Sequence, residues 1–388
     1  MPPQPRGWAP FALGFRPFFL AAGVYAVLLM GLWLLMLRGT IVPTSVSPFV
    51  WHGHEMLFGF AVAVIAGFLL TAAQNWTGIR TPSGSTLAAL FLLWLAGRIG
   101  FLIPDLPAVP VAAVDLAFLP VLGVTLAWPI IRAKQLHNYP FPVMLLALAA
   151  ANALVHGPTF GWSSGTESLG LRLAAYVVVT MIVMMGGRVI PSFTDNKLNT
   201  RARRWKTIET LVPAVTLGAL IASLVAPASI VTMLLAAIAA VVHAIRLAGW
   251  YTPKYWAVPL LWVLHFGYAW ITLGFALLAL SAAGVDAAAN SALHAFTAGG
   301  IGMLTLGMMA RVSLGHTGRM LEPARLITLA FVAVSLAAFV RVFLPLVFPD
   351  ALAQGYAVSG ILWMLAFGTF ATIYLPILMR PRVDGRKG

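Results

Sequence analysis

Apolar stretches of about twenty residues follow one another along the whole sequence, separated by short segments rich in Pro, Gly and Arg. An α-helix needs about 20 apolar residues to cross a bilayer, and in lipid it must satisfy its backbone hydrogen bonds internally. Because 61% of the residues are hydrophobic and only 9% are charged, the composition is that of a chain built for lipid. We therefore expect an all-α, polytopic membrane protein.

Twelve such stretches cover residues 1–388 as one integral membrane domain, with no soluble domain beside it. The weakest boundary is at residues 225–229, which carry no charge and one proline. Arg6 and Arg16 precede the first stretch, which lacks a small-residue cleavage site at its end, so we expect it to be retained rather than removed as a signal peptide. The expected helices span residues 17–37, 51–74, 86–103, 107–131, 140–157, 169–190, 208–226, 228–248, 257–281, 290–311, 324–346 and 355–379.

The placement of positive charges predicts the orientation of the chain. A net charge of +14 would indicate nucleic acid binding in a soluble protein. Across twelve alternating helices, however, the 24 Lys and Arg residues fall on one side, except for Arg38, Arg98, Arg172 and Arg341. The positive-inside rule then places both termini in the cytoplasm, as in a bacterial inner membrane. The basic loop at residues 197–206 is expected to face anionic lipid, not nucleic acid.

Several histidines are expected inside the membrane, where ionisable residues are costly and indicate function. Because the sequence has no cysteine, any metal must be held by His, Met or carboxylate groups. His265 is expected deeper than the others, with Tyr268 about one turn further on the same face; a single buried histidine is equally often a packed core residue. Four histidines are expected together in the outer third of the membrane: His52, His54, His156 and His294.

Helical geometry separates the two histidines of residues 51–56. At about 100° per residue, His52 and His54 point to different sides of a regular helix. Glu55 lies on the face of His52, where it suits proton transfer or a bond to that imidazole; alternatively it is a carboxylate stabilised at a helix N-terminus. Arg98 and Asp115 are expected at similar depth and can pair, although Arg98 can equally hold a haem propionate.

A constant offset of 240 residues aligns the helix at 51–74 with the helix at 290–311. The helix at 169–190 joins this alignment more weakly, which predicts three four-helix repeats at residues 1–137, 138–254 and 255–388. Matched histidines on two such helices are a natural pair of axial haem ligands, and matched glycines allow close approach. The aligned pairs are His54 with His294, Gly59 with Gly299, and Gly67 with Gly307, and Arg341 echoes Arg98.

Six segments carry a resemblance that spans nearly the whole chain: residues 14–19 (GFRPFF), 51–56 (WHGHEM), 67–71 (GFLLT), 75–78 (NWTG), 187–191 (GRVIP) and 311–319 (RVSLGHTGR). In these segments the sequence resembles the NnrS family, membrane proteins of the nitric oxide response that are described as containing haem and copper. The resemblance implies haem b and copper as cofactors and nitric oxide as the partner molecule.

The histidines are the expected holders of both cofactors. We expect haem at His54 and His294, with Arg98 and Arg341 near it, and copper at the remaining histidines, His52, His156 and His265. The helix count, the orientation and the His54–His294 pair also resemble the catalytic subunit of haem-copper oxidases and nitric oxide reductases, which is built from three four-helix arcs. The histidine pattern of the copper site in that subunit is absent here.

Three functions are compatible with these residues. The first is reduction of nitric oxide to nitrous oxide, with Glu55 and Tyr268 as proton carriers and quinol or another donor supplying electrons. The second is a non-catalytic haem-copper protein that binds or senses nitric oxide or protects against it. The third is a twelve-helix transporter. Transporters often bind their substrate at the membrane midplane, whereas the polar cluster here is expected near the outer face, which argues against this function.

Overall fold

The computed structural model describes residues 7–41, 46–103 and 105–386, so that Arg6 lies outside the described residues. In this part of the chain the structure is entirely helical. The helices are α1 (Phe15–Leu37), α2 (Pro48–His54), the π-helical η1 (Glu55–Ala61), α3 (Val62–Thr77), α4 (Gly84–Gly100), α5 (Ala108–Arg132), α6 (Pro140–Phe160), α7 (Glu167–Leu198), α8 (Lys206–Val225), α9 (Ile230–Gly249), α10 (Pro259–Ala282), α11 (Asp286–His294), the π-helical η4 (Ala295–Ile301), α12 (Gly302–His316), α13 (Arg325–Val347) and α14 (Leu352–Met379), with 3-10 turns η2 (Leu136–Asn138), η3 (Pro253–Ala257) and η5 (Pro349–Ala351).

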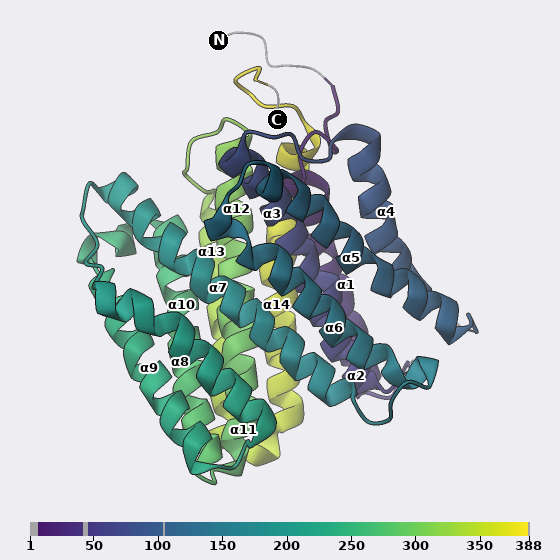
Figure 1. The fold of residues 1–388 in the computed structure, drawn as a ribbon, viewed down its shortest axis with the longest axis vertical. Helices are drawn as coiled ribbons and strands as arrows, with labels where there is room; N and C mark the ends of the chain where they lie inside the picture. Colours follow the sequence, from purple (N-terminus) through teal and green to yellow (C-terminus); the bar gives the residue numbers. More distant parts are fainter. Residues whose placement is uncertain (1–6, 42–45, 104, 387–388) are drawn as a thin grey trace. The chain divides into compact units, whose positions relative to one another are not determined.

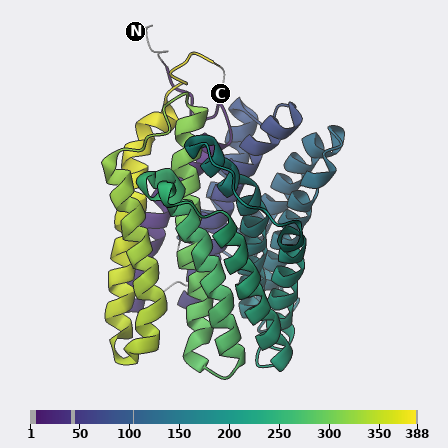
Figure 2. The same cartoon turned by 90° about the vertical axis from the view of Figure 1, so that its left-hand side faces the viewer.

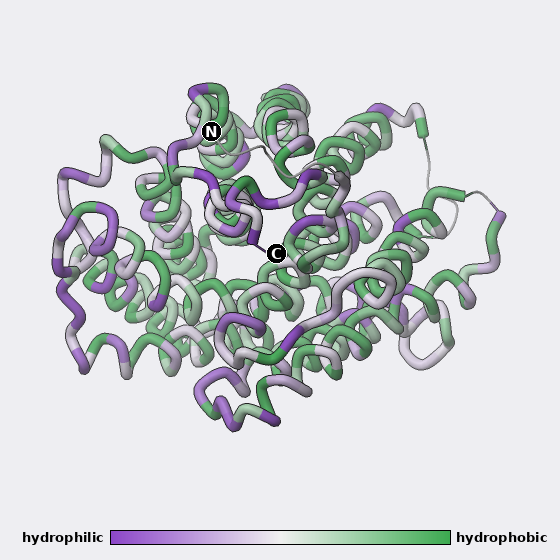
Figure 3. The backbone as a smooth tube through the Cα atoms, turned by 90° about the horizontal axis from the view of Figure 1, so that it is seen from above, coloured by the Kyte–Doolittle hydropathy of each residue, from purple (hydrophilic) through white to green (hydrophobic). Residues whose placement is uncertain are grey.

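These elements form twelve helices in the described residues, because α2, η1 and α3 are continuous, as are α11, η4 and α12. Eleven of them are long and apolar enough to cross a membrane, and α4 is the shorter apolar twelfth. Figure 3 shows hydrophobic residues along the helices and hydrophilic residues mainly in the connecting segments. The predicted all-α membrane fold is therefore confirmed, including the break at residues 225–229, where α8 ends and α9 begins after a gap of four residues (226–229).

Two helices contain π-helical segments, which are rare and occur frequently at functional sites. One begins directly after His54 and the other directly after His294, and each has seven residues. The same 240-residue offset that aligns the sequences also relates these two irregularities. The coincidence supports an equivalence of the two helices, while the predicted three-fold repeat stays a prediction.

The chain forms two compact units, and the first comprises residues Met1–Val177, Met309–Leu321 and Phe367–Gly388. In this unit α1 packs on α3 because Gly67 has no side chain: a Cβ there would lie 2.9 Å from the ring of Phe19. The start of α1 and the end of α14 lie at the same end of the unit (Figure 1). Arg16 links the start of α1 to the end of α14, because its Nη1 donates to the carbonyls of Leu378 (3.0 Å) and Arg380 (2.6 Å).

The second unit comprises residues Val178–Met308 and Glu322–Ala366. Here α8 pairs with α9, α9 with α10, and α10 with α11. Figure 2 shows α10 and the helix that follows it as two green helices lying side by side and joined by a short turn. Gly299 permits a close contact, because a Cβ at this position would lie 2.5 Å from the ring of Trp270. The aligned glycines therefore lie where helices pack closely, as predicted.

Candidate metal centre

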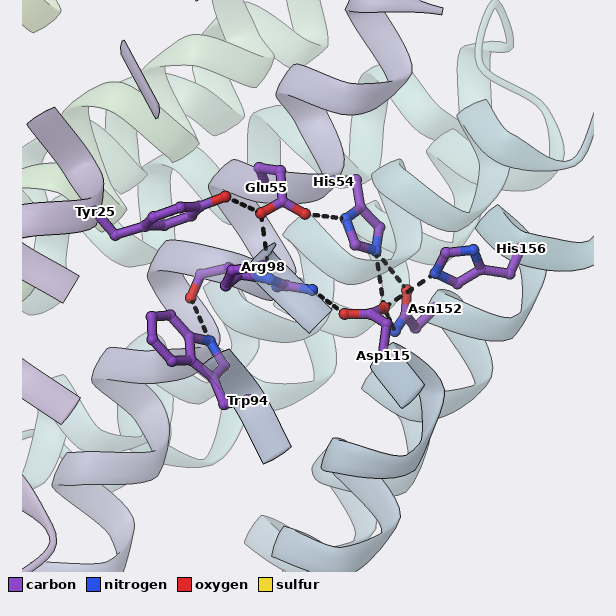
Figure 4. A network of polar contacts seen from close by, with 9 residues as sticks. Tyr25, His54, Glu55, Trp94, Arg98, Asp115, Asn152 and His156 are labelled. Carbon is purple, nitrogen blue, oxygen red and sulfur yellow. Dashed lines mark hydrogen bonds and ion pairs between the residues drawn. The ribbon is translucent and has the colours of Figure 1, made fainter. Parts of the chain in front are cut away.

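Three side chains from three helices of the first unit converge in its interior (Figure 4). His54 ends α2, Asp115 lies in α5 and His156 lies in α6. The Oδ2 atom of Asp115 is 3.1 Å from Nε2 of His54 and 3.0 Å from Nε2 of His156. All three residues are at least 95% buried, and their three ligand atoms lie within 4.8 Å of one another. This arrangement can hold a metal ion.

Two further side chains contact this cluster and fix its orientation. Oε1 of Glu55 lies 2.7 Å from Nδ1 of His54, on the side of the ring opposite the cluster. Asn152 donates from Nδ2 to Oδ2 of Asp115 at 2.7 Å, and its Oδ1 lies 3.0 Å from Nε2 of His54. A carboxylate on the far nitrogen of a histidine is the usual partner of a metal-binding imidazole.

Arg98 links the two carboxylates of the site. Its Nη2 pairs with Oδ1 of Asp115, and its Nε lies 3.3 Å from Oε2 of Glu55. The hydroxyl of Tyr25 donates to the same Oε2 of Glu55. The carboxylates of Glu55 and Asp115 carry two negative charges and the guanidinium of Arg98 carries one positive charge. When both imidazoles are neutral, the buried cluster therefore has a net charge of about −1. A bound cation would offset that charge.

Glycines let the helices come close enough for these contacts. A Cβ at Gly59 would lie 2.7 Å from Tyr25, 3.0 Å from Glu55 and 3.3 Å from Arg98, so only a glycine leaves room for that group. On α4, a Cβ at Gly97 would lie 3.1 Å from Oδ1 of Asp115. The packing of α1, α4 and α5 around α2 and η1 is thus part of the site.

The structure unites several of the predicted residues and separates others. The predicted ion pair of Arg98 with Asp115 is confirmed. Glu55 contacts His54 and not His52, because its side chain is held between Nδ1 of His54 and the side chains of Tyr25 and Arg98. His52 instead stacks on Trp33, with ring centroids 4.2 Å apart. The three residues His54, Glu55 and Asp115 belong to one network, and His52 contacts a different neighbour.

Other predicted residues lie in the second unit and have other neighbours. The hydroxyl of Tyr268 lies 2.7 Å from Nδ1 of His243 and accepts from Nη1 of Arg246 at 2.9 Å. Arg246 in turn pairs with Glu209 at 2.5 Å. This buried network connects α8, α9 and α10. His265, expected on the same face as Tyr268, stacks on a different partner, Tyr255 in η3, at 4.1 Å.

His294 and Arg341 also belong to the second unit. Nδ1 of the half-buried His294 lies 2.9 Å from the carbonyl of Asn290. The guanidinium of Arg341 lies over the ring of Tyr356, 4.2 Å from its centroid. The pairing of His294 with His54 across the two units stays a prediction.

Sequence reasoning missed Tyr25, Asn152 and Phe101. A signal existed for Asn152, since it precedes His156 by four residues and so shares its face of α6. Phe101 contacts both imidazoles, with its ring centroid 5.0 Å from that of His54 and 5.9 Å from that of His156. Nothing in the sequence marks Tyr25, because a tyrosine in an apolar helix is common at any packed position.

Fold and site together define a polytopic membrane protein with a buried cluster of two histidines and one carboxylate that can hold a metal ion. The family described as NnrS protein matches residues 9–382, and the chain belongs to this family. The predicted resemblance is thereby confirmed. No curated protein matches the sequence.

Proposed function

We propose that this chain is a metal-dependent membrane protein that acts on nitric oxide, with the metal held by His54, Asp115 and His156. The observation that carries the proposal is the convergence of two Nε2 atoms on one carboxylate oxygen. Both ring nitrogens of His54 face oxygen acceptors. Such a ring either carries two protons or has a metal ion in place of one of them. A metal at Nε2 satisfies both histidines with a single cation.

The distances fit this assignment. Nitrogen and carboxylate ligands lie about 2.0–2.2 Å from a metal such as zinc, so that two ligands of a tetrahedral site are about 3.3 Å apart. The separations of 3.0 and 3.1 Å from Asp115 to the two imidazoles require only a small outward movement of the side chains. Glu55 then holds the proton on Nδ1 of His54 and directs Nε2 towards the metal.

Copper is the metal that the family resemblance implies, and imidazole ligands suit it. Two histidines and one carboxylate are also the donor set of non-haem iron(II) sites. Both metals are redox-active and would supply the electron-transfer chemistry that nitric oxide reduction requires. Metal analysis decides between them.

We propose that His54 binds the metal ion and not haem. A macrocycle bound to its Nε2 would overlap Asp115 and Asn152, whose oxygen atoms lie within 3.1 Å of that nitrogen. We therefore propose His294 as the haem-binding histidine. The bond of its Nδ1 to the Asn290 carbonyl supports this role, because it orients the ring and leaves the lone pair on Nε2.

Reduction of two nitric oxide molecules to nitrous oxide and water consumes two protons and two electrons. The hydrogen-bonded series from Tyr25 through Glu55 to His54 supports proton delivery, because each group can hold or pass a proton next to the cluster. Tyr268 lies in the other polar network and is proposed as a carrier only for that unit. Quinol or another donor would supply the electrons.

Metal content tests the proposal. The detergent-purified protein should contain a stoichiometric amount of copper or iron by elemental analysis, and His54→Gln, Asp115→Asn and His156→Gln should each lose it. His52→Ala is the matched control, since it lies two residues from His54 but stacks on Trp33. Retention of the metal in all three site variants, or its absence from the folded wild-type protein, would contradict the proposal.

Turnover separates the catalytic function from its alternatives. A reductase consumes nitric oxide anaerobically when a reductant is supplied and releases nitrous oxide, whereas a binding or protective protein takes up one equivalent at most. A Soret band that is lost in His294→Ala and kept in His316→Ala would support the haem assignment. A protein with neither metal nor haem would favour transport.

A further inference from the structure

A small cavity, lined by apolar side chains together with His156 and Thr159, lies where α4 ends, α5 begins and α6 ends, all in the first unit. Its volume is about 20 Å³. On this measure about 10–15 Å³ holds one water molecule, so the cavity has room for one molecule of water-like or diatomic size. Among its lining residues are Gly100, Phe101, Val111, Ala112, His156 and Thr159.

One member of the candidate metal site, His156, forms part of the wall of this cavity. His156 lines the cavity, and its Nε2 is the atom that lies 3.0 Å from Asp115. Phe101 also lines it and covers both imidazoles: its ring is stacked on His156 at an interplanar angle of 11° and lies 5.0 Å from the ring of His54. A molecule in the cavity therefore contacts a ligand of the proposed metal directly.

The outer part of the cavity reaches apolar surface. Ile103 and Leu106 line it and are 47% and 42% exposed. Among the described lining residues none carries a charged side chain. An anion such as nitrite would lose hydration there and meet no positively charged side chain among the described lining residues, which costs several kcal/mol for a buried ion. A small uncharged molecule meets no such barrier.

We propose that this cavity is the access path by which a small uncharged ligand reaches the metal site, and that Phe101 and Ala112 set its size limit. The inference rests on the proposed function, because it assigns the path to the same metal site. It adds the class of ligand, a neutral molecule of at most two heavy atoms, and the route from the exposed side chains of Ile103 and Leu106.

The path can be tested by thiol modification, which needs no metal. Because the natural sequence has no cysteine, any thiol reaction comes from the one thiol that is introduced. Ala112→Cys places one thiol in the cavity wall. It should be oxidised by hydrogen peroxide, a neutral molecule of two heavy atoms, and should resist the bulkier, charged thiol reagent 2-(trimethylammonium)ethyl methanethiosulfonate. Ala66→Cys, fully buried in α3, should resist both reagents, and Ser164→Cys, exposed in the loop between α6 and α7, should react with both.

Equal reaction of Ala112→Cys with both reagents, or with neither, would overturn the path. These outcomes do not depend on metal binding, so they are distinct from failure of the proposed function. If the protein binds metal but the thiol in the cavity wall does not react, the proposed function stands and the access path is overturned.

A second experiment tests the size limit in the metal-loaded, reduced protein, with carbon monoxide as the probe. Its rebinding after a laser flash is followed at the C–O stretching band, and metal content is measured for each variant. Ala112→Leu adds three carbon atoms to the cavity wall, fills the cavity and should slow rebinding about ten-fold, which corresponds to about 1.4 kcal/mol on the barrier. Phe101→Ala should accelerate it. Rates equal to that of the control Ala113→Leu in both variants would overturn the assignment.

Discussion

Glu55 is a fully buried carboxylate at the point where α2 passes into η1. Its two oxygens contact three groups: His54 on Oε1, and Tyr25 and Arg98 on Oε2. An uncompensated buried charge would be strongly unfavourable, so the arginine is needed for the carboxylate to remain ionised. The carboxylate then acts on the metal site through the orientation and basicity of the His54 ring.

Replacing Glu55 by glutamine should weaken metal binding while the three ligands remain. Loss of such a carboxylate partner typically lowers metal affinity about 10–100-fold. Titration against a competing chelator measures the effect in purified protein. Glu322→Gln, at an exposed position outside the site, is the control and should leave the affinity unchanged. An unchanged affinity in Glu55→Gln would show that Glu55 does not act on His54.

At the scale of helices, the site depends on how closely their backbones approach. Gly170 of α7 is the clearest case, because a Cβ there would lie 2.6 Å from the carbonyl oxygen of Ala151 and 2.9 Å from the amide nitrogen of Val155. Both atoms belong to the backbone of α6, which cannot turn aside as a side chain can. Asn152 and His156 each follow one of these two residues, so this contact positions two members of the site.

The substitution Gly170→Ala should therefore displace α6, lower the thermal stability of the protein and weaken metal binding. Overpacking of this kind typically costs about 1–3 kcal/mol. Gly218→Ala in α8 is the control: its Cβ would lie no closer than 3.8 Å to its nearest neighbour, Leu235, and it should be neutral. Thermal unfolding and chelator titration of both variants measure the two effects. Equal behaviour of the two variants would refute the role of the close contact.

At the scale of the whole chain, three helices, α7, α12 and α14, continue from one compact unit into the other. If all twelve helices cross the membrane, both termini lie on one side of it, and α1 and α14 meet at one end of the first unit, where the Ala9 amide donates to the Met379 carbonyl at 2.9 Å. The uneven distribution of Lys and Arg supports a cytoplasmic location for this end.

Single cysteines test this orientation cleanly, since the natural sequence has none. In intact spheroplasts a membrane-impermeant maleimide should label Ser164→Cys, in the exposed loop between α6 and α7, and spare Arg201→Cys, between α7 and α8. Permeabilised membranes should show both labelled. The reverse pattern in spheroplasts would invert the orientation, and equal labelling of the two would mean that α7 does not cross the membrane.

The sequence by itself determined the twelve helices and nearly all of their boundaries. Each follows from a local property: a run of apolar residues long enough for the bilayer, ended by Pro, Gly or charge. It also determined the kind of ligand, because without cysteine only histidine, methionine and carboxylate remain. The pairing of Arg98 with Asp115 could be predicted from the sequence, because two opposite charges at the same depth in lipid are each costly unless they pair.

The tertiary structure decided which histidines share a site. Depth along a helix can be predicted from sequence, but the direction of a side chain depends on the rotation of its helix against the neighbours. Glu55 lies against His54 and not His52 because Tyr25 and Arg98, on two other helices, hold its carboxylate there. Contacts such as those of Gly59 and Gly170 then fix the helices at distances that no single helix encodes. For this reason His156 and Asn152 became neighbours of His54, and Tyr25 of Glu55, only in the folded chain.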